Sequence, residues 1–291
     1  MGVLTGKKIC IDAGHYGLYN RSPGVPEYYE STMAWKLHLL LKKYLEDLGA
    51  EVILTRPNQS VDKALKERGM TAADCDLFIS IHSNAVGSYM NESVDYAAVY
   101  HLVADTTTLS DDVSKEIAAK LAPVIAEVMG TNQGYKILTR KSDNDRNGDG
   151  MFNDNYYGVL NGARLVDVPA VLLEHSFHTN TRMAKWLIVD SNLNKLAKAE
   201  AECIAEYFTG KPVSIGKKPS TDKLYRVQVG AFTVKKNADN LREALNAHGI
   251  SAYTTHVGRY YKVQAGAFSN EANAEAMKAK IEKLGYDAII V

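Results

Sequence analysis

Four side chains could together hold a metal ion and use it for hydrolysis. His15 follows the apolar segment KICIDAG, and His82 lies near the end of the apolar segment DLFISIHSNA. Glu174 ends the segment VPAVLLE, and Glu30 comes directly before the helical pattern STMAWKLHLLLKKYLEDLG. Two histidines and a glutamate, with one position left open for water, are the donor set of a catalytic zinc site.

The remaining carboxylate would complete a hydrolytic site. Zinc lowers the pKa of its bound water to about 7 and polarises a carbonyl group. A free carboxylate beside it can take the proton of that water and return it to a leaving amine. Two imidazoles, one ligating carboxylate and one free carboxylate are therefore the set that metal-assisted amide hydrolysis requires.

Strand ends must bring these side chains together. Apolar segments of strand length alternate with helical patterns through residues 1–210, which predicts an α/β fold with a twisted, mainly parallel sheet and helices on both faces. Ligands of such sheets gather at the carboxyl ends of the strands. His15, His82 and Glu174 are expected at such ends, and the loop after His15 returns Glu30 to the same edge.

A second, smaller domain is expected after a linker. The segment GKPVSIGKKPSTDK has no apolar period, which predicts a linker at residues 211–222. YRVQVGAF (225–232) then recurs 36 residues later as YKVQAGAF (261–268), and each copy continues into a helical pattern and a second strand. This predicts a small α+β ferredoxin-like domain of βαββαβ order over residues 223–291, beside a first domain over 1–210.

Composition excludes several classes of protein. The formal net charge is +0, so no global field recruits nucleic acid or a membrane surface. Residues 1–210 carry 27 acidic and 21 basic side chains, whereas 223–291 carry 10 basic and 6 acidic ones. This asymmetry favours an anionic surface as the target of the second domain, with ordinary surface variation as the simpler interpretation.

Targeting and cysteine signals are weak. The three cysteines lie far apart and predict no disulfide framework, which favours a reducing compartment. No run of about 18 apolar residues predicts a membrane helix. The first residues, MGVLTGKK, lack an apolar stretch, so we expect synthesis in the cytoplasm without a signal peptide.

Several motifs in order resemble one known family. IDAGHYG, Glu30, LTR (54–56), ER (67–68), ISIHSNA (79–85) and VPAVLLEHSFHTN (168–180) are similar to motifs of the zinc-dependent N-acetylmuramoyl-L-alanine amidases of the third amidase family, over about residues 7–208. The resemblance implies zinc on His15, Glu30 and His82, with Glu174 as the catalytic glutamate. The chain departs from the family pattern at Tyr16 and Ser176, where small residues are usual, and both are expected to alter the substrate pocket.

The repeated segments resemble a SPOR (sporulation-related repeat) domain, which binds peptidoglycan glycan strands. Strand alternation predicts that Tyr225, Val227 and Val229 pack on the helices, together with Tyr261, Val263 and Ala265 of the second copy. The opposite face would then bind the glycan or be ordinary sheet surface. Its predicted residues are Arg226, Gln228, Tyr260, Lys262 and Gln264.

The segment SDNDRNGDGMFND (142–154) has the spacing of a calcium loop. Asp143, Asp145, Asn147, Asp149 and Asp154 supply oxygens near an EF-hand-like turn glycine. Helical patterns do not flank the segment, and its twelfth position is aspartate where glutamate would be bidentate. The alternative is a solvated insertion beside the active-site edge.

The two resemblances imply hydrolysis of the amide between N-acetylmuramic acid and L-alanine in peptidoglycan, with the second domain holding the enzyme on the wall, whereas spacing alone indicates only a zinc hydrolase. The alternatives are another zinc-dependent wall hydrolase, such as a peptidase or a deacetylase, and an inactive wall-binding protein. Without a signal peptide, the enzyme is expected to reach the cell wall after release by lysis. A phage endolysin and a mother-cell autolysin of sporulation both fit that route. The sequence predicts no oligomeric state.

Overall fold

The computed structural model describes residues 2–103, 109–146, 154–215, 225–250, 252–268 and 271–291. The chain divides into two compact units, Met1–Ser214 and Ile215–Val291. Each unit is described by itself. Most of the predicted linker, from residue 216 on, lies outside the described residues.

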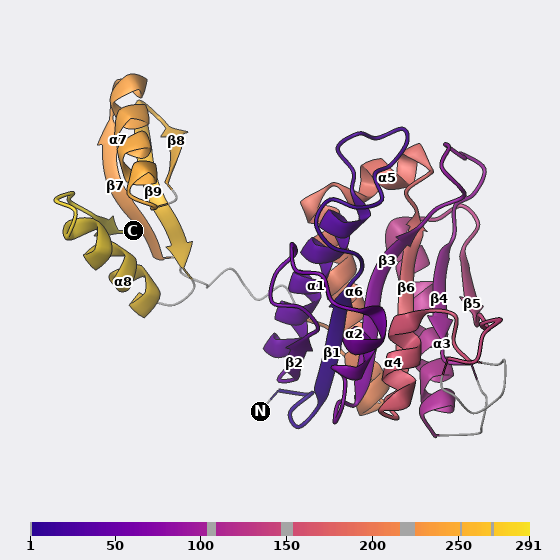
Figure 1. The fold of residues 1–291 in the computed structure, drawn as a ribbon. Coiled ribbons are helices and arrows are strands. Elements are labelled where there is room, and N and C mark those ends of the chain that lie inside the picture. Colours follow the sequence, from indigo (N-terminus) through magenta and orange to yellow (C-terminus); the bar gives the residue numbers. More distant parts are fainter. Residues whose placement is uncertain (1, 104–108, 147–153, 216–224, 251, 269–270) are drawn as a thin grey trace. The chain divides into compact units, whose positions relative to one another are not determined.

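The first unit is built on a six-stranded sheet of order β2-β1-β3-β6-β4-β5 (Figure 1). Its strands are β1 (Lys8–Ala13), β2 (Glu51–Leu54), β3 (Leu77–Asn84), β4 (Ala97–His101), β5 (Tyr135–Leu138) and β6 (Ala170–Phe177). Strands β2, β1, β3 and β6 are parallel to one another. Strand β4 is antiparallel to β6, and β5 is parallel to β4, so the sheet is mainly parallel, as predicted.

Helices cover both faces of this sheet. On one face, α1 (Glu30–Asp47) packs on β1 and β3, α3 (Leu109–Met129) packs on β4 and β6, and α6 (Asp190–Thr209) contacts both helices. On the other face lie α2 (Leu65–Met70) and α4 (Gly158–Leu165), while α5 (Thr181–Leu187) follows β6. Every residue of β6 is buried, so this strand is covered on both sides, and its first four residues, AVLL, are all apolar.

Helices α2 and α4 pack closely because each has a glycine at their contact. A Cβ on Gly162 would lie 2.1 Å from the carbonyl oxygen of Lys66, and a Cβ on Gly69 would lie 2.0 Å from that of Val159. Only glycine allows the two backbones to approach so closely. The sequence did not reveal α4 or α5, since both are short and α4 carries glycine in its interior.

The second unit has the predicted βαββαβ order. Strands β7 (Tyr225–Phe232), β8 (Tyr253–Val257), β9 (Tyr260–Phe268) and β10 (Ile289–Ile290) form an antiparallel sheet of order β10-β7-β9-β8. Helices α7 (Lys235–Ala247) and α8 (Glu271–Glu282) pack on it. Val227, Val263 and Ala265 are buried in the core of this unit, on the face that the alternation predicted.

Among the described residues, no helix is long and apolar enough to cross a membrane.

Candidate active site

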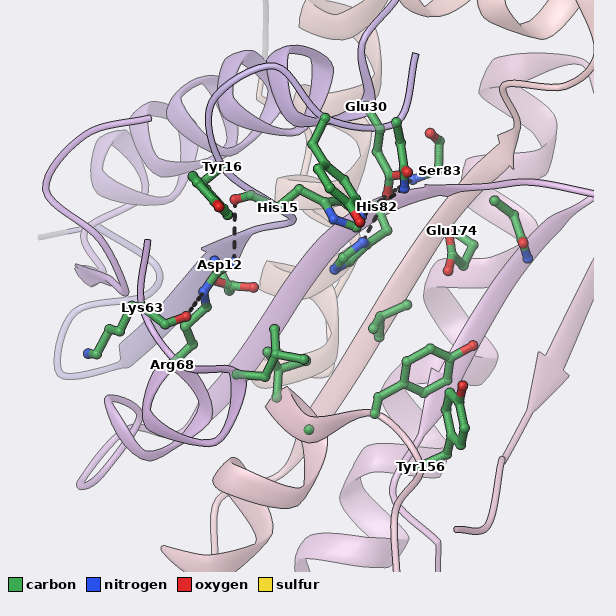
Figure 2. A pocket seen from close by; sticks show the side chains of 18 of the residues that line it. Asp12, His15, Tyr16, Glu30, Lys63, Arg68, His82, Ser83, Tyr156 and Glu174 are labelled. Carbon is green, nitrogen blue, oxygen red and sulfur yellow. Dashed lines mark hydrogen bonds and ion pairs between the residues drawn. The ribbon is translucent and has the colours of Figure 1, made fainter. Parts of the chain in front are cut away.

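A pocket of about 820 Å³ opens beside the carboxyl ends of β1 and β3 (Figure 2). His82 and Glu174 face it as direct neighbours, because they are paired in register on the parallel strands β3 and β6. His15 follows the end of β1, and Glu30 is the first residue of α1. The structure therefore brings into one pocket the four side chains that the sequence singled out.

Three of these side chains converge on one point. The Nε2 atom of His15 lies 3.2 Å from Oε1 of Glu30, and Nδ1 of His82 lies 2.9 Å from the same oxygen. One donor atom from each of the three residues lies within 4.8 Å of the others. Two imidazoles and a carboxylate at this spacing could hold a metal ion.

Local backbone geometry explains the Gly-His sequence after β1. A Cβ on Gly14 would lie 2.5 Å from Cε1 of His82, so only glycine leaves room for that ring. His15 has φ of 58°, in the left-handed region that costs free energy for a residue with a side chain. Arg56 and Arg68 donate to the carbonyl oxygen of Ala13 at 2.6 and 3.4 Å and brace this turn.

The Glu30 carboxylate is buried and held by fixed donors. Asn20 donates its Nδ2 to Oε2 at 2.7 Å, and the backbone N–H of Ser83 donates to Oε1 at 3.1 Å. Burial alone would raise the pKa of Glu30, but hydrogen bonds from His15 and His82 outweigh it and hold the pKa well below its usual range. Glu30 is therefore ionised, as a metal ligand must be.

Glu174 has the opposite character. It is 7% exposed, and its Oε2 is buried without a hydrogen-bond partner among the described residues. Burial first, and then the nearby charge of Glu30, raise its pKa well above the usual range. Two neighbouring carboxylates with pKa values pushed apart in this way are suited to different roles.

A hydrogen-bond chain orients His82. The hydroxyl of Ser80 donates to Oδ2 of Asp12 at 2.9 Å, so Ser80 Oγ is left to accept from Nε2–H of His82 at 3.1 Å. Without a metal ion, Nδ1–H of His82 can donate to Glu30. With an ion bound at Nδ1, Ser80 would hold the remaining ring proton on Nε2. Partners of this kind fix the tautomer and direction of metal-binding histidines.

Two further histidines support the strand that carries His82. Nδ1 of His178 lies 2.9 Å from the Ser83 hydroxyl, which also meets the Tyr28 hydroxyl at 2.5 Å. His175 is fully buried, and its two ring nitrogens lie 2.8 Å from the carbonyl oxygen of His82 and 2.7 Å from Glu200. Both histidines support the site from outside the converging group.

A cation fits the point where the three donor atoms meet. An ion bound there would take the place of the proton between Nδ1 of His82 and the Glu30 oxygen, and would attract both atoms. The described residues contain this single group of clustered histidine and acidic ligands. The donor set therefore matches a metal centre with one carboxylate, Glu174, left outside it.

The two departures from the family pattern lie in different places. Tyr16 is 44% exposed and lines the pocket. Ser176 is fully buried with φ of 56°, and its hydroxyl donates to Asp95 at 3.0 Å. The glycine usual at position 176 therefore suits the left-handed backbone conformation there. Ser176 is not among the residues that line the pocket.

The calcium loop is unsupported. Asn147 and Asp149 lie outside the described residues, and Asp143, Asp145 and Asp154 do not belong to the described group of clustered ligands. The Asp154 carboxylate accepts a hydrogen bond from the backbone N–H of Arg146. Strand-like pairing of Lys141 with Asn155 replaces the flanking helices of an EF-hand.

The face predicted to bind glycan is partly open. Arg226 is exposed, whereas Gln228, Tyr260 and Lys262 are half-buried. Gln264 is only 8% exposed and lies opposite Gln228 across β7 and β9, so it has little surface left for a ligand. The Oε1 atom of Gln228 has no hydrogen-bond partner among the described residues.

The fold and the site define a metal-site hydrolase of the α/β class. The chain belongs to the N-acetylmuramoyl-L-alanine amidase family (Amidase_3), which matches residues 9–206, and a SPOR domain matches residues 221–291. It is therefore a peptidoglycan amidase, as the motifs predicted, and these two domains imply binding to peptidoglycan.

Individual relatives agree with this assignment. The chain is 31% identical over 251 residues to the sporulation-specific N-acetylmuramoyl-L-alanine amidase of Bacillus subtilis, covering 84% of this chain and 83% of the relative. It is 29% identical over 248 residues to the amidase CwlM of Bacillus licheniformis, with the same coverage. The catalytic domain of the amidase CwlV from Bacillus (Paenibacillus) polymyxa shares its fold, with a TM-score of 0.54 and 24% identity over 70% of this chain and 99% of that one.

The predicted cellular route is wrong. We expected a protein that stays in the cytoplasm until lysis releases it, because its first residues lack an apolar stretch. The Bacillus subtilis relative is named as sporulation-specific, which assigns that wall enzyme to a developmental programme. A missing apolar stretch is too weak a signal to decide how such an enzyme reaches the wall.

Replacing Ser80 tests the support of His82. Ser80→Ala removes the acceptor for Nε2–H, so we expect affinity for a divalent ion to fall by about 10- to 100-fold. Competition between the protein and a chromogenic chelator for Zn²⁺ measures this affinity. Ser114→Ala is the matched control, because it removes a buried hydroxyl from α3, away from the pocket. Unchanged ion affinity in Ser80→Ala would refute the role given to Ser80.

Glu174 should make stability depend on pH in the metal-free protein. Its pKa is higher in the folded than in the unfolded protein. Its contribution to the free energy of unfolding is therefore fully present below about pH 4.5 and is lost as pH rises through the folded pKa. Relative to wild type, Glu174→Gln should therefore gain free energy of unfolding by up to about 1.4 kcal/mol per pH unit above pH 4.5. Urea denaturation in chelator from pH 4.5 to 8 measures this gap. Glu127→Gln, an exposed change on α3, should stay within about 0.5 kcal/mol throughout.

Proposed function

We propose that this amidase uses zinc held by His15, Glu30 and His82, with Glu174 as its general base and acid. The observation that carries the proposal is the contrast between the two buried carboxylates. Glu30 is fixed by two imidazoles, an amide and a backbone N–H, whereas one oxygen of Glu174 has no protein partner among the described residues. The first suits a ligand, and the second suits a group that must exchange a proton.

Zinc, when bound, would lower the pKa of a water molecule and polarise the lactyl carbonyl of N-acetylmuramic acid. Glu174, which is paired in register with His82, would accept a proton from the attacking water. The same carboxyl then donates that proton to the departing nitrogen of L-alanine, which leaves as an amine. Burial favours the protonated form of Glu174 and so favours this second transfer.

The second domain would concentrate the enzyme on its substrate. We propose residues 1–210 as the catalytic domain, 211–222 as the linker and 223–291 as the wall-binding domain. Attachment through one domain raises the effective concentration of the other at the wall, by an amount set by the linker. The proposed glycan face is Arg226, Gln228, Tyr260 and Lys262, with Gln264 as support beneath it.

Digestion of purified peptidoglycan tests the catalytic proposal. The full chain should release stem peptides with new L-alanine amino termini, and a chelator should stop this release until zinc is restored. Glu174→Gln should lower the rate by about 10²–10⁴-fold while zinc stays bound, because only proton transfer is lost. Glu127→Gln is the matched control and should retain the wild-type rate. New reducing sugars in place of amino termini, or full turnover by Glu174→Gln, would contradict the proposal.

Sedimentation with insoluble wall tests the glycan face. Gln228→Ala combined with Lys262→Ala should raise the Kd for wall by about tenfold, because an amide acceptor and a cation are removed from one face. Hydrolysis of a soluble muropeptide should remain at the wild-type rate. Lys235→Ala on α7, which removes an exposed cation from a helix, should bind like wild type. Equal wall binding by the double variant would exclude this face.

A further inference from the structure

The segment that resembled a calcium loop carries an arginine into the catalytic pocket. Arg146 and Tyr156 both line the pocket, together with Glu174. Figure 2 shows Tyr156 below Glu174, on the side of the pocket away from Tyr16. Neither the metal site nor the proton transfer uses these two residues.

Backbone pairing holds this cluster in place. The two arms of the segment form a short ladder, in which Ser142 N–H donates to the Asp154 carbonyl at 2.8 Å and Tyr156 N–H donates to the Arg140 carbonyl at 2.9 Å. The side chain of Arg146 is tied back by its Nε, which donates to the Ser142 hydroxyl at 2.8 Å. The arginine is therefore positioned by the described ends of the segment.

Two guanidinium groups gather on the exposed ring of Tyr156. Arg140 lies 3.5 Å and Arg146 lies 5.7 Å from its centroid. Among the described residues, the terminal nitrogens of Arg146 have no protein acceptor, although its Nε is bonded to Ser142.

The acidic residues of the segment 142–154 that the structure describes do not line the pocket. They are Asp143, Asp145 and Asp154. Asp154 is buried and accepts from the Arg146 backbone. The side of the pocket beside Tyr156 therefore presents a cation with free donors, and the planar fork of arginine matches a carboxylate.

The direction of the reaction indicates which part of the substrate lies there. Glu174 gives its proton to the leaving amine, so the stem peptide departs from the Glu174 side of the cleaved bond. Figure 2 places Tyr156 on that side of Glu174, and Arg146 lines the same pocket with its guanidinium 5.7 Å from the Tyr156 ring. We infer that Arg146, stacked with Tyr156, binds a carboxylate of the stem peptide and makes the enzyme select stems with a free acid over amidated ones. This inference rests on the proposed function.

Two muropeptides that differ only at the second stem residue test this subsite. One carries a free α-carboxylate there, and the other carries the carboxamide. We expect the wild-type full chain to have a KM about tenfold lower for the acid than for the amide. Arg146→Gln should remove this difference by raising the KM for the acid substrate alone. Arg146→Lys should keep part of the preference, because it keeps the charge without the planar fork.

Lys136→Gln is the matched control. It removes a cation on β5 that lies 3.9 Å from the ring of Tyr96, and Lys136 does not line the pocket. This variant should retain the wild-type preference. Equal KM values for both substrates in wild type would overturn the inference. An equal rise in KM for both substrates in Arg146→Gln would also overturn it.

A binding experiment separates this inference from the catalytic proposal. Calorimetry of Glu174→Gln, with and without Arg146→Gln, measures affinity for the same two muropeptides without turnover. A tenfold preference for the acid that disappears with Arg146→Gln supports the subsite even if no amide is cleaved. A preference that survives Arg146→Gln refutes the subsite even if the enzyme is an active zinc amidase.

Discussion

Burial of the Glu30 carboxylate is the constraint on which the active site depends. An ionised carboxylate away from water costs several kcal/mol unless donors or a cation compensate it. Here His15, His82, Asn20 and the Ser83 backbone supply that compensation. Burial raises the pKa of Glu174, and the charge of Glu30 raises it further. The two buried carboxylates are thus electrostatically linked.

Rigid elements on several sides keep the active site in place. Strand register fixes His82 beside Glu174, and helix α1 begins at Glu30. Ser80 and Asp12 orient His82 from the sheet face. The pocket wall formed by α2 and α4 depends on the close approach of two glycines. Hydrolysis at a fixed point requires this kind of support, because misplacement by about 1 Å can cost 100-fold in rate.

Residue patterns predicted the parts of the site that strand ends determine. His15, His82 and Glu174 could be placed because apolar runs ended next to them, and the motif order linked them to Glu30. The Asp12–Ser80–His82 chain could not be predicted, since it depends on the register between β1 and β3. The sequence indicated this hydrogen-bond chain only by one polar residue inside each apolar strand, Asp12 in β1 and Ser80 in β3. The calcium hypothesis failed for a similar reason, because spacing alone does not show that residues 141 and 155 pair as strands.

The two neighbours of His15 allow very different amounts of sequence change. Position 14 faces the imidazole of His82, where even a methyl group would collide, whereas the side chain at position 16 is 44% exposed. Substitution at position 16 can therefore change the mouth of the pocket, whereas a side chain at position 14 would disturb His82. The backbone beside His15 thus leaves room for a large side chain on one side of the histidine and for none on the other.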